Sequence, residues 1–495
     1  MRLRRVISQV SLFFFLLFLT TATFGQASYT AQIRGVITDS SGAVIANATV
    51  TIVSDDTGIA NTVQTTDQGL YILTGLRPSS YTLRAVAPGF QAVEKKNLVL
   101  QVNQQTSVNL KLSPAGVNTT VAVVADTAPL LDTESANLGT DVTNEYVHDI
   151  PLYNRSVFGL AFLAGGVTET TGSGVNDNYP AGTNFVSNGQ RNATAEVRLD
   201  GNPISAPEQG EGGNTNVYFQ PSVEIIQEFK VQNNSFSAEF GNNGGTVMNV
   251  VLKQGTNKLH GSGWWYGQRS AFDSRDFFNS GEKPDHSRDQ YGFSLGGPLV
   301  KNKTFFFIDF ERVGQSDPVP IEAVVPTDLE RAGNFTNSGT PIFDPHNCTG
   351  DPCTRPRFSF NGVDDVIDPA AIDPIGQAIL NLYPHANVAG ATFPDPNFRT
   401  VVLTNFSSWQ FDVKLDHFFN EKHKISGRYS HHSDDSSTPT VLANDLINDG
   451  IISKTSVHNG GLEYNWMLSP RLLWTSRIGV DRVRAPGQTL SLIHI

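Results

Sequence analysis

The chain has 495 residues and a net charge of −12, and no basic run occurs beyond its N-terminus, so the composition argues against nucleic acid as a partner. Its length has room for roughly two to four domains. The counts of 44 Gly and 31 Phe, against 17% charged residues, favour strands and turns over helices and predict an all-β dominated fold.

The N-terminus predicts export. Arg2, Arg4 and Arg5 precede an apolar run at Val10–Leu19, and small residues follow up to Ala27. This order is that of a secretory signal peptide, which we place at residues 1–27. The alternative, a membrane anchor, is disfavoured because a span needs about 20 apolar residues. No later segment of the sequence is apolar enough for a transmembrane helix, so a membrane protein would have to be a β-barrel.

Residues 28–112 predict a β-sandwich, because short β-rich runs such as "ATVTIV" and "YTLRAVA" alternate with turn signals. The segments "GVITDSSGAVIANATVTI" and "TTDQGLYILTGLRPSSYTLRAVAPGF" resemble the carboxypeptidase-regulatory-like domain, a transthyretin-like sandwich. The resemblance implies an accessory module without catalysis, often grouped with carbohydrate-binding-like folds. Tyr71 and Tyr81 are the candidate stacking platforms for a sugar, although we expect both in the core.

Residues 113–255 resemble the plug domain of TonB-dependent outer-membrane receptors, in the subfamily that begins with such a sandwich. The matching segments are "IPLYNRSVFGLAFLAGGV", Asp200-Gly201, "EIIQEFKV" and "AEFGNNGGTVMNVVLK". The resemblance implies a small α/β unit inside a barrel, and a free-standing α/β domain remains the alternative. It also implies a segment that contacts an energy-coupling protein in the periplasm. The nearest candidate is Thr120, Val121, Ala122, Val123 and Val124, although any β-prone linker could look like this.

Residues 256–489 predict the first part of a transmembrane antiparallel β-barrel. The run "WQFDVKLDHF" places Trp409, Phe411, Val413 and Leu415 on one face of a strand and Gln410, Asp412, Lys414 and Asp416 on the other. An apolar face of this kind faces either a protein core or lipid. Strands of similar pattern are expected at 259–270, 288–299, 304–314, 409–419, 423–433, 457–468 and 471–483.

The lengths of the connections favour lipid. Long connections at 270–287, 316–407 and 434–456 alternate with the short ones "VKNK", "NEKH" and "SP". This alternation is typical of a barrel whose short turns face the periplasm and whose long loops face outside. Tryptophans near the strand ends fit an interfacial aromatic girdle. We therefore expect the apolar face to contact lipid and the charged face to line the lumen.

The 316–407 loop also resembles the receptor subfamily, through "VPTDLERAGNFT", "PIFDP" and "IDPAAIDPIGQAILNLYPHAN", and we expect it to gate or capture a ligand. It contains the only two cysteines, Cys348 and Cys353, which we expect to form a disulfide in an oxidising compartment. Two thiols do not complete a metal site. The cluster "HHSDD", with His431, His432, Asp434 and Asp435, is interpreted as a solvated rim rather than a metal site.

The barrel cannot close within this sequence. A plugged transporter barrel has about 22 strands of roughly 9–11 residues, which would use up the whole of residues 258–489, where about seven strands can be read. The last residues, 490–495, read "LSLIHI", and their codons can spell the mosaic-end sequence of a sequencing-library transposase. We interpret them as a non-native end of a fragment, and a genuine short strand is the alternative.

No GxSxG, HExxH, P-loop or spaced Cys/His cluster occurs in the sequence, so we expect neither an enzyme nor a cofactor. The resemblance implies a TonB-dependent receptor that imports a scarce solute across the outer membrane. Its expected partners are outer-membrane lipid, a TonB-type coupling protein and a solute. The sequence leaves the class of solute open among sugar, peptide, siderophore and cobalamin. The alternative function is surface adhesion or carbohydrate binding without transport.

Overall fold

The computed structural model describes residues 29–489 apart from 116–120, 125–136, 151, 153–154, 170–184, 191–193, 206–216, 218–219, 238, 242–243, 276–282, 392–393, 439–450, 470–471 and 486. Three units follow one another, which we call the sandwich (residues 29–112 together with 121–124), the inner unit (137–252) and the barrel sheet (260–489). The predicted signal peptide and residues 490–495 lie outside the described residues. Within the described ranges, none of the helices has the length and apolar content needed to span a bilayer.

The sandwich packs two sheets around one apolar core. Their strand orders are β4-β1-β7, with β8 beside β1, and β3-β2-β5-β6-β9. The strands are β1 (Ala31–Thr38), β2 (Thr49–Ser54), β3 (Ala60–Gln64), β4 (Leu70–Leu76), β5 (Ser79–Val86), β6 (Val93–Leu100), β7 (Gln105–Ser107), β8 (Leu110–Lys111) and β9 (Val121–Val124). Tyr71 and Tyr81 are buried in the core, as predicted, so neither ring is offered to a sugar.

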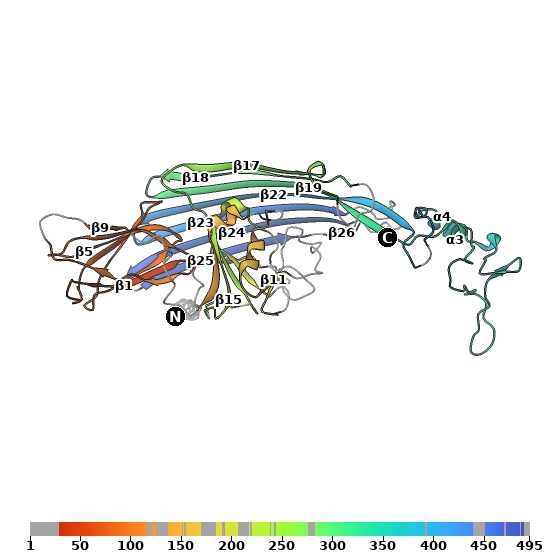
Figure 1. Cartoon of the computed structure of the whole chain (residues 1–495), viewed down its shortest axis with the longest axis horizontal. Coiled ribbons are helices and arrows are strands. Elements are labelled where there is room, and N and C mark those ends of the chain that lie inside the picture. The colour runs from red at the N-terminus through yellow and green to blue at the C-terminus, as the bar shows by residue number, and fades with distance from the viewer. Residues whose placement is uncertain are drawn as a thin grey trace, which may run out of the picture.

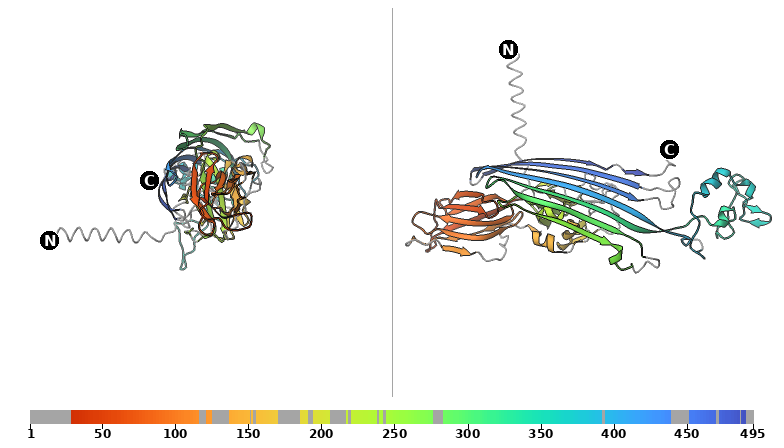
Figure 2. Two further views of the ribbon diagram at one scale, coloured as in Figure 1. Left: turned by 90° about the vertical axis from the view of Figure 1, so that its left-hand side faces the viewer. Right: turned by 90° about the horizontal axis from the view of Figure 1, so that it is seen from above.

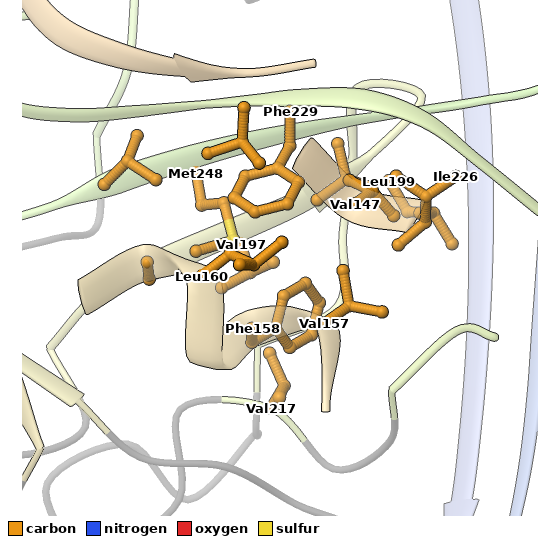
Figure 3. Close-up of a cluster of buried hydrophobic side chains, with 14 of the residues drawn as sticks. Val147, Val157, Phe158, Leu160, Val197, Leu199, Val217, Ile226, Phe229 and Met248 are labelled. Carbon is orange, nitrogen blue, oxygen red and sulfur yellow. The ribbon is translucent and has the colours of Figure 1, made fainter. Parts of the chain in front are cut away.

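The inner unit is a small mixed sheet, in the order β10-β15-β16-β13-β14, with short helices against it. The elements are β10 (Leu138–Val142), α2 (Asn144–Asp149), η2 (Val157–Leu163), β11 (Val167–Glu169), β12 (Phe185–Ser187), β13 (Glu196–Leu199), β14 (Asn202–Pro203), η3 (Val223–Ile225), β15 (Ile226–Asn234) and β16 (Val247–Leu252). Every residue of the central strand β16 is buried, as expected for a strand covered on both faces. Phe158 and Phe229 lie in the core between helix and sheet (Figure 3).

The barrel sheet is antiparallel and has the order β17-β18-β19-β22-β23-β24-β25, with β26 paired to β24. Its strands are β17 (His260–Arg269), β18 (Ser287–Val300), β19 (Thr304–Ala323), β22 (Phe398–Asn420), β23 (His423–Thr438), β24 (Ile451–Ser469), β25 (Leu472–Arg484) and β26 (Gly487–Thr489). All seven predicted strands are present, and short and long connections alternate as expected. The sheet is curved when viewed from the sandwich end (Figure 2).

The two ends of the barrel sheet therefore differ. The sandwich lies at the end with the short connections, and the long loop, with α3 (Asp328–Arg331) and α4 (Pro374–Leu380), lies at the other end (Figure 1). Since short turns of outer-membrane barrels face the periplasm, this arrangement assigns the sandwich to the periplasmic end and the long loop to the outer end.

The long loop is shorter than predicted, and the boundaries 316–407 are wrong. Strands β19 and β22 continue beyond the membrane-length segment and pair as far as Ala323 and Phe398, so the loop covers residues 324–397. Pro318 and Pro320 argued against a strand here, yet both lie in β19. They are tolerated because β18 pairs with β19 only as far as Ser316, so beyond that point β19 has a free edge where a missing N–H costs little.

The loop is folded around one buried arginine. The guanidinium of Arg331 donates hydrogen bonds to the carbonyl oxygens of Pro326, Tyr383 and Pro384 at 3.1, 3.0 and 2.6 Å. Thr327 and Glu330 form a capping box at the start of α3. Arg331 thereby joins the two ends of the loop into a compact structure.

Candidate functional site

The two faces of the barrel sheet are inverted relative to a water-soluble protein. Trp409 and Leu415 are 39% and 47% exposed, whereas Lys414 and Asp416 are each 1% exposed. The exposed apolar side chains of the sheet include Trp265, Tyr291, Phe293, Tyr429, Leu462, Trp466, Trp474, Ile478 and Val480. Charges on the covered side and aromatic and aliphatic groups on the outer side are the arrangement of a strand between lumen and lipid. The predicted orientation of the two faces, apolar outward and charged inward, is confirmed.

The inner unit lies on the lumen face and is held there by a buried ion pair. The ammonium of Lys414 lies 2.6 Å from Asp200 Oδ2 and donates a second hydrogen bond, at 2.9 Å, to the carbonyl of Leu252. Asp200 and Gly201 have φ of 46° and 79°, so the turn between β13 and β14 directs the carboxylate at the wall. Burial alone would raise the pKa of Asp200, but the charges of Lys414, Arg77 and Arg428 together outweigh it and hold that pKa below its usual range.

Two wall glycines allow the inner unit a close approach. Gly461 and Gly479 face each other on β24 and β25. A Cβ at Gly479 would lie 2.9 Å from Oδ1 of Asn202, which directly follows the Asp200-Gly201 turn. A side chain at either position would first displace the Asn202 amide, so the glycines leave room for that side chain against the wall.

Higher on the wall, the lumen face carries opposed acidic groups. Asp309 and Asp412 are register partners on β19 and β22 and are 0% and 2% exposed. Ser222 of the inner unit donates a hydrogen bond to Asp309 Oδ1 at 2.6 Å. On β17, the hydroxyl of Ser262 donates to Glu224 Oε2 of the inner unit at 3.4 Å. The lumen wall and inner unit therefore meet through polar groups, alongside Phe307 and Val457, which join the apolar core of the inner unit.

The interpretation of "HHSDD" as a solvated rim is wrong for two of its members. His432 and Asp434 are buried, with His432 Nε2 at 2.7 Å from Asp434 Oδ1. Both lie on the lumen face because they share the parity of Arg428, while Asp435 points outward and is exposed. Among the described residues no group of three or more potential ligands could hold a metal ion.

The candidate coupling segment forms an edge strand of the sandwich. Val121–Val124 is β9, which pairs in parallel with residues Val93 to Lys96 of β6. Thr120 lies outside the described residues. At the opposite end of the molecule, Cys348 and Cys353 are joined by a disulfide in the exposed part of the long loop, with Cα atoms 5.4 Å apart.

Glu228 links the inner unit to the sandwich. Its carboxylate accepts a hydrogen bond from the backbone N–H of Val102 and is largely withdrawn from solvent. Burial raises the pKa of Glu228 to about 8; the Asp141 carboxylate adds to the rise, and the Val102 N–H and Lys230 oppose it.

This pKa predicts that the free energy of unfolding depends on pH. The folded state binds the Glu228 proton more tightly than the unfolded chain, whose value is near 4.5, so the stabilisation is complete below that value and is lost as pH rises through about 8. We expect the urea midpoint to fall between about pH 5 and about pH 9, and Glu228→Gln to remove most of this slope. Glu145→Gln, at an exposed position of α2, is the matched control and should retain it.

Comparison with known proteins gives two family matches. Residues 251–492 match the outer membrane beta barrel domain, and residues 32–113 match the carboxypeptidase regulatory-like domain. The TonB-dependent transporter Oar of Myxococcus xanthus is 28% identical over 306 residues, which cover 59% of this chain. The matched part is 27% of the length of that transporter, so the chain spans about a quarter of its curated relative.

Solved structures of low sequence identity also match. The outer membrane transporter YddB from Escherichia coli has a TM-score of 0.44 and 11% identity, with 69% of this chain and 38% of that chain covered. A mutant of the ferric enterobactin receptor PfeA from Pseudomonas aeruginosa has a TM-score of 0.35 and 12% identity, covering 72% and 46% of the two chains.

Proposed function

Since this chain is a TonB-dependent receptor of the outer membrane, with a carboxypeptidase regulatory-like domain ahead of its β-barrel domain, we propose that the complete protein imports a scarce solute across that membrane. The observation that carries the proposal is the separate folded unit on the lumen face, tied to the wall by Lys414 and Asp200. We assign this inner unit as the plug. Contacts between polar groups suit a plug that must shift and reseat, because water can replace them when they separate.

The energy for import would come from a TonB-type protein of the inner membrane. Strand β9 is the proposed contact, since an edge strand presents backbone groups that another chain can pair with. We place solute capture at the long loop and the outer end of the lumen. The protein is proposed to transport rather than catalyse, as its relative is a transporter. Adhesion through sugar binding finds no support in the sandwich, where Tyr71 and Tyr81 are buried.

Uptake by cells tests this proposal. A strain that lacks the gene should lose accumulation of one member of a panel of radiolabelled iron chelates, cobalamin, oligosaccharides and peptides. Accumulation should also stop when the coupling protein is deleted or the proton gradient is collapsed, and return with the complete gene. Uptake that continues without the coupling protein would refute energised import.

A proline in β9 tests the coupling segment. Val123→Pro removes a backbone N–H and disrupts strand pairing, so we expect binding of the receptor to the purified periplasmic domain of the coupling protein to weaken by roughly tenfold or more. Val123→Thr keeps the N–H and the branched side chain and should bind within about twofold of the original. Biolayer interferometry with the detergent-solubilised receptor measures both. Equal binding of the two variants would place the coupling contact elsewhere.

A further inference from the structure

The turn between β4 and β5 carries a buried arginine into the end of the lumen that has the short connections. Arg77 is 5% exposed although it lies in a turn. Its Nη1 lies 3.0 Å from Asp416 Oδ1 on β22, and its Nη2 donates to Ser426 Oγ on β23 at 2.8 Å. Nη1 also donates to Gln254 Oε1, just after the inner unit, at 3.1 Å. One side chain of the sandwich thus contacts the barrel sheet and the segment that leads from the inner unit into it.

Two further contacts seat the sandwich. The hydroxyl of Tyr29 donates to Glu463 Oε1 on β24 at 3.0 Å, and Arg77 lies beside that hydroxyl at 3.3 Å. On the other side of the turn, the backbone N–H of Asn257 donates to the carbonyl of Asp56 at 2.9 Å. The sandwich is therefore held under the barrel sheet at several points (Figure 1).

A cavity of about 400 Å³ lies where the three units meet. Its lining comes from the sandwich, the inner unit and the wall, and includes Arg77, Pro78, Gln227, Lys253, His260 and Ser262. The sandwich turn forms the periplasmic side of this space. A path between the inner unit and the wall at this position would pass the sandwich turn.

The contact between the sandwich and the rest of the molecule, which we call the seat, consists mainly of polar groups whose hydrogen bonds water can replace. Among the described residues, the buried apolar cluster shared by sandwich and inner unit is the small one of Tyr29, Val102 and Val251. A buried ion pair gives little net stabilisation, because separating its charges restores their hydration. Losing one partner is different, because it leaves the other charge buried and alone. Such a contact is specific when closed and can still open.

We propose that the sandwich is a stopper at the periplasmic end of the barrel and that Arg77 is its latch, whose ion pair with Asp416 must separate before the cavity opens to the periplasm. The solute path that the stopper would close rests on the proposed import function. The latch itself is a property of this chain and can be measured without any solute.

The test uses one reporter cysteine in the complete protein. Gln227→Cys places a thiol in the cavity, in a background with Cys348→Ser and Cys353→Ser, and the rate of its labelling by a membrane-impermeant maleimide is measured in proteoliposomes with the sandwich outward. When the sandwich closes again faster than the maleimide reacts, the labelling rate is proportional to the fraction of molecules in which the sandwich has moved away from the barrel sheet. Arg77→Gln should raise it by about tenfold or more, and Asp416→Asn should do the same. Arg84→Gln, an exposed arginine of the same sandwich, should leave the rate unchanged.

A reversible lock covers the case in which Arg77→Gln fails to fold. The backbone N–H of Asn257 donates to the carbonyl oxygen of Asp56 at 2.9 Å, so Asp56→Cys with Asn257→Cys brings two thiols within reach of a disulfide across this contact. Labelling should slow by about tenfold when this pair is oxidised and recover on reduction. The proposal is overturned if Arg77→Gln labels like Arg84→Gln, or if the oxidised and reduced forms of the locked protein label alike. Absence of import in cells would leave either result unaffected.

Discussion

Replacing Leu462 with arginine is expected to lower the free energy of unfolding in a lipid bilayer by about 2–4 kcal/mol, the usual cost of a charge on the lipid face near the bilayer midplane. Leu462 is 47% exposed on β24, and its register partners on β23 and β25 are Gly427 and Ile478. The small glycine leaves the side chain open to its surroundings. If those surroundings are hydrocarbon, the guanidinium has no partner there.

The measurement is urea unfolding of the complete protein in vesicles, followed by tryptophan fluorescence. Leu462→Ala removes apolar area without adding a charge and should cost clearly less than arginine does. Ile375→Arg, at an exposed position of α4 in the long loop, introduces the same group outside the membrane and should be nearly neutral. If Leu462→Arg proved as harmless as Ile375→Arg, the outer face of the sheet would not contact lipid.

The sequence predicted this face correctly because a strand offers only two sides. Glu463 is buried between exposed Leu462 and Trp466, as the alternation in "LEYNW" requires. The same rule could have placed His432 and Asp434 on the same side of β23 as Ser426 and Arg428, whose parity they share. The error came from interpreting a short polar cluster by its composition and not by its register.

Other features depend on neighbours that lie far away in the sequence. The predicted strand ended at Gly314, and only the end of the pairing with β18 at Ser316 explains why Pro318 fits in its continuation. Nothing local in the sequence around Arg77 indicates that its side chain reaches Asp416. For the candidate site, Lys414 could be assigned to the lumen by its parity. Its partner Asp200 belonged to a recognised motif, yet their contact spans more than 200 residues, and no periodicity encodes it.

Lys414→Met is expected to loosen the inner unit from the wall more than any other single substitution of the lumen face. It leaves Asp200 without its charged partner in a buried place, which costs about 3–5 kcal/mol. The double variant Lys414→Met with Asp200→Asn removes both charges and should recover much of that loss, so the two substitutions should be far from additive. Lys422→Met, an exposed lysine at the adjacent short turn, is the matched control.

Two measurements separate loss of seating from loss of the barrel. Limited proteolysis in outer-membrane vesicles opened to the periplasmic side should cut the inner unit of Lys414→Met about a hundredfold faster than that of Lys422→Met, because cleavage follows the population of the unseated form. The heat-modified mobility of the barrel on gels should stay the same, since the wall strands keep their backbone pairing. Single and double variants with additive costs would show that Lys414 and Asp200 contribute separately. The plug would then be held by its apolar contacts with Phe307 and Val457, and ion pairing would not govern its movement.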